Sequence, residues 1–314
     1  MIHKLSTYKY GSMGVNSLFD IDVEHQIIDI CYYKDYGYFF ISKYSNTIGH
    51  IDIDNDGKIE NDFIGNPNEN SGCKNGRMEY SSFDSPCAIR YSVFHNGLVI
   101  LENHGKQIRK VSREIYHATS MIDYTEKENM EKRFVKNKRN YDLCDFEIAD
   151  SGAMYWVVGA INKGFKSEFC TFDHFFGSGR SGYSHSTNVL SSDFNSPSGI
   201  CVNGSDIYVA DTFNHCIRKI VKKYSDVNVS DVSIVAGNPL ISGDKDGIKN
   251  DCLLMCPTKM ISLKKCCYFI DHHKIKCLSL ADNAVNTIYE SDDIITISDN
   301  GEDKLIIVEV ENET

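Results

Sequence analysis

Acidic residues between positions 52 and 60 have the types and the spacing of a calcium-binding loop. The sequence there reads D-x-D-x-D-G-x-x-E, with Gly57 at the sharp turn. Calcium is held by carboxylate and carbonyl oxygens, so the ligands of this candidate site would be Asp52, Asp54, Asp56 and Glu60. An EF-hand is disfavoured, because Phe63 stands where that motif places a bidentate glutamate.

The same segment also has the pattern of a β-hairpin. Asn and Gly in "NDG" (55–57) accept positive φ, which makes this tripeptide a strong hairpin signal. Ile51, Ile53 and Ile59 alternate as strand residues do. We therefore favour an acidic hairpin without a cofactor, and calcium binding at these carboxylates is the alternative.

A second group of metal-ligand types lies near the C-terminal end. Between residues 252 and 277 the chain carries five cysteines and two histidines, which are the residue types that bind zinc. Their spacing contains no C-x-x-C pair, and Cys267 and Cys277 occupy strand positions. We interpret them as thiols of the hydrophobic core, where a free cysteine behaves as a small apolar residue.

Two inserts carry candidate binding residues. "KRFVKNKR" (132–139) concentrates positive charge, and "GSGRSGYSHSTNVLSSD" (177–193) is rich in Gly and Ser. Loops of this kind commonly hold the binding residues of a scaffold. The candidate contacts to a partner are Arg133, Lys136, Lys138, Arg139 and Arg180. The alternative for the first insert is a solvated loop without a partner.

A fourteen-residue pattern recurs along the chain and organises these segments. In "IYVADTFNHCIRKI" (207–220) an apolar strand ends in Asp211, and a turn leads to a second strand with basic residues. Related copies are "YFFISKYSNTIGHI" (38–51), "LVILENHGKQIRKV" (98–111), "YWVVGAINKGFKSE" (155–168) and "CYFIDHHKIKCLSL" (267–280). In the weakest copy, Asn162 takes the place of Asn214. A period of roughly 50 to 60 residues with several short strands predicts a β-propeller.

The two ends of the chain complete one further copy. "KLIIVEVENET" (304–314) matches the first half of the pattern, with Glu309 in the place of Asp211. "MIHKLSTYKYGS" (1–12) matches the second half, with Ile2 and Leu5 in the places of Ile217 and Ile220. We expect the N-terminal strands to close the last blade, which removes an open sheet edge and makes residues 1–314 one complete propeller domain.

One copy has a recognisable family pattern. "FNSPSGICVNGSDIYVADTFNHCIRKI" (194–220), followed by "VSIVAGNPLISGDKDG" (232–247), resembles an NHL repeat. The resemblance implies an all-β, six-bladed propeller that works as a binding or scaffold module.

Composition bounds the remaining classes. The net charge of −11 disfavours a broad nucleic-acid surface. The N-terminal residues lack a signal-peptide pattern, and the longest apolar run, 154–161, is far shorter than the ~20 residues of a membrane helix. We predict a cytoplasmic protein with reduced cysteines and no membrane contact.

These observations predict a non-enzymatic module that recognises a protein or peptide on a loop face of the propeller. The first rival is a metal-dependent hydrolase or lyase with its site in the central channel. The second is an RNA-binding NHL propeller. The sequence contains no H-E-x-x-H, G-x-S-x-G or phosphate-loop motif that would support catalysis.

Overall fold

A computed structural model gives the positions of most of the chain. It describes residues 2–9, 15–22, 26–33, 36–42, 45–51, 63–66, 72, 74–77, 80–102, 107–112, 117–123, 144–168, 171–184, 186, 188–222, 230–300 and 303–310. These residues form six antiparallel sheets, as the repeat predicts, and the fold is a six-bladed β-propeller. In the described part of the chain, no helix is long and apolar enough to cross a membrane.

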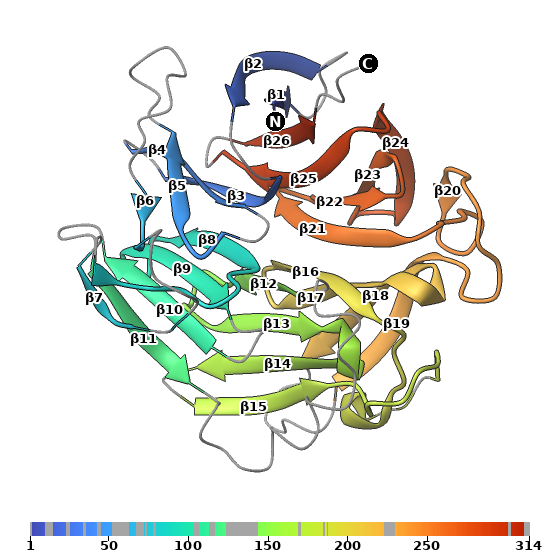
Figure 1. Cartoon of the computed structure of the whole chain (residues 1–314). Helices are drawn as coiled ribbons and strands as arrows, with labels where there is room; N and C mark the ends of the chain where they lie inside the picture. Colours follow the sequence, from blue (N-terminus) through green and yellow to red (C-terminus); the bar gives the residue numbers. More distant parts are fainter. Residues whose placement is uncertain are drawn as a thin grey trace. The chain divides into compact units, whose positions relative to one another are not determined.

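The chain divides into two compact units of three blades each. Unit 1 comprises residues 1–126 and 292–314, and unit 2 comprises residues 127–291. Figure 1 shows the strands of both units, coloured along the sequence.

Unit 1 contains blades 6, 1 and 2. Blade 6 comprises β25 (Ile294–Asp299), β26 (Lys304–Val310), β1 (Ile2–Lys9) and β2 (Val15–Asp22). Blade 1 comprises β3 (Ile27–Tyr33), β4 (Gly37–Ser42), β5 (Ile48–Ile51) and β6 (Phe63–Ile64). Blade 2 comprises β8 (Ala88–Ser92), β9 (Gly97–Glu102), β10 (Gln107–Ser112) and β11 (His117–Asp123), with the short β7 (Gly76–Arg77) at its outer edge.

Unit 2 contains blades 3, 4 and 5. Blade 3 comprises β12 (Cys144–Ile148), β13 (Met154–Val158), β14 (Lys163–Glu168) and β15 (Thr171–Phe176). Blade 4 comprises β16 (Pro197–Asn203), β17 (Asp206–Asp211), β18 (Cys216–Lys222) and β19 (Ser230–Gly237). Blade 5 comprises β21 (Pro257–Leu263), β22 (Cys266–Asp271), β23 (Lys274–Ser279) and β24 (Ala284–Glu290), with β20 (Gly247–Ile248) at its outer edge. The described residues of this unit also form three short 3-10 helices: η2 (Gly159–Ile161), η3 (Val189–Ser191) and η4 (Thr212–Asn214).

The N-terminal strand closes blade 6, as predicted. β1 lies between β26 and β2, and it pairs with β26 from His3 opposite Val310 to Lys9 opposite Lys304. Figure 1 shows this pairing of the first and last strands of the chain. Backbone groups that would otherwise form an open edge are thus paired within the sheet.

The predicted register of β1 was wrong by three residues. Lys4 lies opposite Glu309, as Cys216 lies opposite Asp211 in blade 4, so Leu5 rather than Ile2 takes the place of Ile217. Burial explains the difference, because Leu5 is fully buried whereas Ile2 is 38% exposed. In the observed register Leu5 joins the apolar cluster between blades 6 and 1.

A shared irregularity aligns the blades more reliably than the sequence does. In five blades the pairing of the third with the fourth strand shifts by one residue, which is a β-bulge. The third-strand residues just after the shift are Ser6, Arg109, Phe165, Arg218 and Lys276. Three of these five positions hold a buried cation.

Blade 3 departs from the predicted alignment by one residue. Asn162 has the left-handed conformation after η2 (φ 54°), which His215 has after η4 (φ 53°). Asn162 therefore takes the place of His215, not of Asn214, and Phe165 takes the place of Arg218. Phe165 stacks on Trp156 with ring centroids 5.7 Å apart. Phe165 and Val158 thus occupy the places at which blade 4 has the charged Arg218 and Asp211.

The hydrophobic cores lie between consecutive blades of each unit. In unit 2 one cluster joins blades 3 and 4, and a second joins blades 4 and 5. In unit 1 the clusters join blade 6 to blade 1 and blade 1 to blade 2. A single blade cannot bury both of its faces, so each blade depends on its neighbours for stability.

Candidate functional site

Three connecting segments of unit 2 meet around the start of β18. The first is the insert between β15 and β16, the second is the turn that contains η4, and the third runs from Asn238 to Cys256 between β19 and β21. Arg180, the predicted binding residue that the structure describes, lies in the first segment.

Hydrogen bonds join the turn to the insert on one side. The Phe213 backbone N–H donates to the Asn195 carbonyl over 3.1 Å, and Asn214 Nδ2 donates to the Gly182 carbonyl over 2.6 Å. Within the insert, Ser181 Oγ donates to Asn195 Oδ1 over 2.9 Å. Arg180 and Tyr183, which flank these residues in sequence, are therefore next to the turn.

The third segment meets the same turn on its other side. Nδ1 of His215 lies 2.5 Å from the Met255 carbonyl oxygen, and Gly237 pairs with Cys216 at the start of β18. Gly237 has φ of 88°, and a Cβ there would lie 2.2 Å from the His215 carbonyl oxygen. This approach of two backbones requires glycine, and it fixes where the chain turns toward Leu240.

Large apolar side chains on these segments face solvent. Tyr183 is 42% exposed and Phe213 is 46% exposed. Leu240 and Ile241, at a turn closed by the Ile241 N–H to the Asn238 carbonyl over 3.1 Å, are 71% and 51% exposed. We define the loop surface by its five exposed members: Arg180, Tyr183, Phe213, Leu240 and Ile241.

A buried ion pair holds the insert in place. Arg218 and Asp211 are both fully buried, and Arg218 Nη1 lies 3.2 Å from Asp211 Oδ2. The guanidinium also donates to two carbonyls of the insert, Asp193 O over 2.5 Å and Ser184 O over 3.2 Å. A planar fork with several donors suits this task, because it can reach a carboxylate and two carbonyls at once.

Other contacts complete this arrangement. The Arg218 guanidinium lies 4.1 Å from the centre of the Phe194 ring, a cation–π contact. Asp211 accepts the Asn195 N–H over 2.7 Å and Asn214 Nδ2 over 2.8 Å. One buried pair thus anchors both the insert and the turn that together carry Arg180, Tyr183 and Phe213.

Blade 5 anchors the third segment with the charges in different places. Lys276 is fully buried, and its Nζ lies 2.9 Å from both Asp244 and Asp246 of that segment. Asp271, in the place of Asp211, accepts the N–H groups of Met255 and Cys256 over 2.9 and 2.7 Å. A point-charge lysine replaces arginine where the loop offers carboxylates instead of carbonyls.

Unit 1 repeats this arrangement in blade 2. Arg109 Nη1 lies 3.4 Å from Glu102 Oε1, with both side chains fully buried. Arg109 also donates to the carbonyls of Ser82 and Lys74, and its guanidinium lies 4.6 Å from the centre of the Phe83 ring. The sequence placed Glu102 and Asp211 correctly in one repeat position, but it did not identify their buried partners. The sequence feature that could have identified these partners is the spacing, since Arg109 follows Glu102 by seven positions and Arg218 follows Asp211 by seven positions.

Burial sets the protonation of Asp211. It raises the pKa of Asp211 from 3.8 to about 6, against the opposing effect of Arg218. In the folded state this carboxyl keeps its proton to higher pH, so its stabilising contribution is complete below about pH 3.8 and is lost as pH rises through about 6. Asn mimics the neutral carboxyl. We therefore expect the stability of wild type relative to Asp211→Asn to fall between pH 4 and pH 7 in urea titrations.

A matched variant reverses the sign of this dependence. Hydrogen bonds from Ser178 and Ser184, together with Arg180, lower the pKa of Asp193, which contributes stability above its unfolded pKa and loses it in acid. The stability of wild type relative to Asp193→Asn should therefore rise as pH increases from 3 to 5. Parallel pH profiles for the two variants would contradict the assignment.

Arg180 contacts Asp193 but remains largely exposed to solvent. Its Nε lies 3.2 Å from Asp193 Oδ1, and its side chain remains 75% exposed. The other predicted binding residues, Arg133, Lys136, Lys138 and Arg139, lie outside the described residues. So do the candidate calcium ligands Asp52, Asp54, Asp56 and Glu60, although the flanking strands β5 and β6 pair antiparallel, as a hairpin requires.

First strands of the blades carry charged side chains, which the enzyme alternative would need. In unit 1, Asp29 pairs with Arg90 over 2.8 Å, and in unit 2, Asp145 pairs with Lys259 over 3.0 Å. Each carboxylate also accepts a backbone N–H from a neighbouring blade, that of Ile89 or Ile200. Among the residues that the structure describes, no group of three or more His, Cys, Asp or Glu side chains could hold a metal ion.

Comparison with known families decides the repeat type. The NHL repeat model matches residues 194–220, the stretch from Phe194 of the cation–π contact to Ile220 in β18. Residues 194–220 of this six-bladed β-propeller thus form an NHL repeat. The NHL repeat-containing protein 2 sequences of Homo sapiens and Bos taurus are each 48% identical to this chain over 56 residues. That stretch covers 18% of this chain and only 7% of those relatives.

Solved structures of other proteins share the propeller fold of this chain at low sequence identity. A chain of a nidogen/laminin complex matches with a TM-score of 0.56 and 12% identity, covering 98% of both chains. An auxiliary nutrient binding protein from Bacteroides ovatus matches with a TM-score of 0.58 and 11% identity, over 99% of this chain and 77% of that one. Virginiamycin B lyase from Staphylococcus aureus, with quinupristin, matches with a TM-score of 0.53 and 12% identity, over 98% and 100%.

Proposed function

We propose that this NHL propeller is a non-enzymatic module that binds a protein partner through the loop surface of unit 2. The observation that carries the proposal is the set of four large apolar side chains that remain 42% to 71% exposed on three connected segments. Exposed apolar residues gathered in one place commonly mark sites of protein association. The partner would contribute apolar side chains to this surface, and Arg180 would donate hydrogen bonds to a carboxylate of the partner at the edge of the surface.

Preorganisation supports this choice of surface. The segments that carry the surface are held by the buried pair of Arg218 with Asp211 and by the buried Lys276, which contacts the more exposed carboxylates of Asp244 and Asp246. A surface ordered before binding avoids the entropic cost of ordering loops on association. Residues at repeated positions of the blades thus order the segments that form the proposed recognition surface.

Charge favours a protein over RNA as the partner. The net charge is −11, and the guanidinium of Arg180 already contacts Asp193. RNA binding requires a positive surface that neutralises phosphates, and it weakens steeply with salt. Binding through apolar side chains is far less sensitive to salt. The basic segment that contains Arg133, Lys136, Lys138 and Arg139 would add a second contact for an acidic partner.

Affinity capture with a matched control tests the proposal. The bait variant is Phe213→Ser with Leu240→Ser, and the control is Val93→Ser with Phe94→Ser, which alters an equally exposed turn between β8 and β9. We expect proteins from cells that express this chain to bind wild type and control alike, and to bind the loop variant at least tenfold more weakly. Losing two interface anchors that each contribute about 1 kcal/mol has this effect.

The same experiment separates the alternatives. Retention of the captured proteins by the loop variant would contradict the proposed surface. Captured material that disappears with ribonuclease or falls steeply between 50 and 200 mM salt would favour RNA instead. A rise in the melting midpoint with millimolar calcium or zinc, abolished by a chelator, would favour the metal-dependent alternatives.

A further inference from the structure

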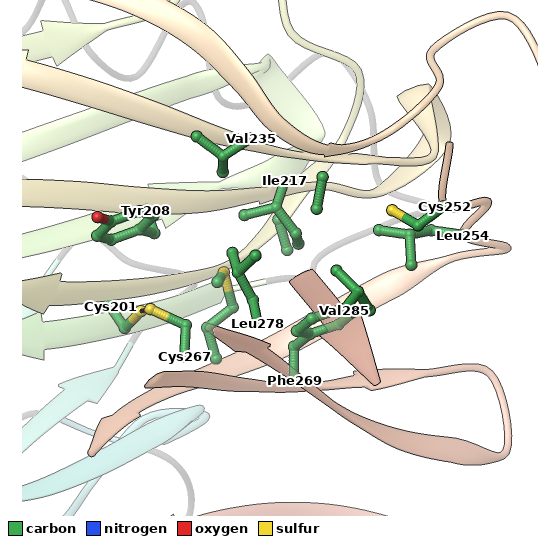
Figure 2. Close-up of a cluster of buried hydrophobic side chains, with 13 residues drawn as sticks. Cys201, Tyr208, Ile217, Val235, Cys252, Leu254, Cys267, Phe269, Leu278 and Val285 are labelled. Atoms are coloured by element: carbon green, nitrogen blue, oxygen red, sulfur yellow. Dashed lines mark hydrogen bonds between the residues drawn. The ribbon is translucent and has the colours of Figure 1, made fainter. Parts of the chain in front are cut away.

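Two buried thiols from neighbouring blades touch one another in unit 2. Cys201 lies on β16 of blade 4, and Cys267 lies on β22 of blade 5. Both side chains are fully buried, and their Sγ atoms are 3.3 Å apart. Figure 2 shows the two sulfur atoms facing each other in the core cluster between these blades.

The Sγ atoms of Cys201 and Cys267 are close in space, although the two residues are far apart in sequence. The two cysteines are 66 positions apart in sequence, and the packing of β16 against β21 brings their blades into contact. A disulfide has an S–S length of about 2.05 Å, so the sulfurs would have to approach by only about 1.2 Å.

Other thiols of unit 2 are placed differently. Cys266 and Cys277 lie on adjacent strands of the same blade, so a bond between them would not link blades. Cys252 donates to the Lys249 carbonyl over 2.9 Å and accepts the Gly237 N–H over 3.0 Å. Cys201 and Cys267 are therefore the pair whose oxidation would join blade 4 to blade 5.

We propose that Cys201 and Cys267 form an oxidation site, at which a small hydroperoxide converts the two thiols into a disulfide between the blades. In the first step one thiol loses its proton and the thiolate attacks a peroxide oxygen. An S–O bond forms, the O–O bond breaks, and the leaving alkoxide or hydroxide takes up that proton, which gives a sulfenic acid and an alcohol, or water from hydrogen peroxide. In the second step the other thiol attacks that sulfur, an S–S bond forms, and water leaves. The two sulfurs lose two electrons in total, and the peroxide gains them.

Burial determines how fast this site reacts. It raises the pKa of Cys201 well above that of an exposed thiol, and the thiolate is the reactive form. Oxidation at neutral pH is therefore slow and needs transient opening between the blades. It accelerates at higher pH and in urea below the unfolding transition. The disulfide therefore forms slowly under sustained oxidation, and the site does not respond to brief exposure to an oxidant.

The disulfide would link the two blades that carry the loop surface. Cross-links that close long segments of chain are the ones expected to stabilise most, and this one closes 66 positions. This inference is independent of the proposed partner, because it concerns the core of unit 2 whether or not the loop surface binds a protein.

Peptide mapping of the full chain tests the site directly. Purified reduced protein is treated with hydrogen peroxide, digested without reduction, and analysed by mass spectrometry. We expect a linked peptide pair containing Cys201 and Cys267, a loss of two free thiols, and a rise of a few degrees in the melting midpoint that dithiothreitol reverses. Cys201→Ala should abolish all three, whereas Cys277→Ala should retain them.

The wild-type result decides the proposal even if a variant fails to fold. Folded wild type that yields linked peptides of other cysteines in place of this pair would overturn it. So would folded wild type that keeps the Cys201 and Cys267 thiols after the less buried Cys87 and Cys256 have been oxidised. A linked pair that forms only in fully unfolding urea would overturn it as well, because native proximity would then play no part.

Discussion

Replacing Arg218 with methionine should lower the free energy of unfolding by about 3–5 kcal/mol. The change removes one partner of a buried ion pair and leaves Asp211 as an uncompensated carboxylate in a fully buried position. It also removes the donors to the Asp193 and Ser184 carbonyls. Urea denaturation at pH 7.5, followed by circular dichroism, measures the loss.

Two matched variants identify the cause of this loss. Arg180→Met breaks an exposed pair with Asp193 and should cost less than about 1 kcal/mol. Adding Asp211→Asn to Arg218→Met should restore part of the stability, because a neutral amide is cheaper to bury than an unpaired charge. If Arg218→Met unfolds within about 1 kcal/mol of wild type, the buried pair is not the anchor described above.

The second large effect concerns the strand that closes blade 6. Leu5 is fully buried in the cluster between blades 6 and 1, so Leu5→Ala should cost about 2–5 kcal/mol through lost burial and the cavity that remains. Ile2→Ala on the same strand should cost less than about 1 kcal/mol, because Ile2 is 38% exposed. Urea unfolding curves of the two variants measure the difference.

Equal losses at Leu5 and Ile2 would contradict the observed register and favour the alignment expected from the sequence. A chain lacking residues 1–9 extends the test, since it would leave the backbone of β26 without its partner strand. Such an open edge promotes association with other chains. Size-exclusion chromatography should therefore show oligomers for the truncated chain and a lower oligomeric state for wild type.

The architecture could be predicted from the sequence because each copy of the repeat shows the strands and turns of one blade. Each copy has an apolar strand, a turn that tolerates left-handed residues, and a second alternating strand, and these local features need no tertiary information. Closure by the chain ends was predictable for the same reason, since each end carries half of the pattern. The exact pairing of β1 was not, because Ile2 and Leu5 are both apolar and only packing distinguishes them.

The candidate site was less predictable than the fold. Arg218 and Arg109 stand in basic strand segments, which usually face solvent, and their burial follows from carbonyls that a distant insert supplies. Phe213 is a single apolar residue in a turn, and Leu240 has only Ile241 beside it, so no periodicity marks them as a surface. The contact between Cys201 and Cys267 depends on the packing of two blades, so no local sequence pattern predicts it.

Site-specific photo-crosslinking tests the central claim, binding of a protein by the loop surface, most directly. Benzoylphenylalanine is placed at position 213 or, as the control, at position 94, and the cells are irradiated. We expect a defined adduct with another protein at position 213, resistant to nuclease and absent at position 94. Equal adducts at both positions, or adducts at position 94 alone, would contradict it.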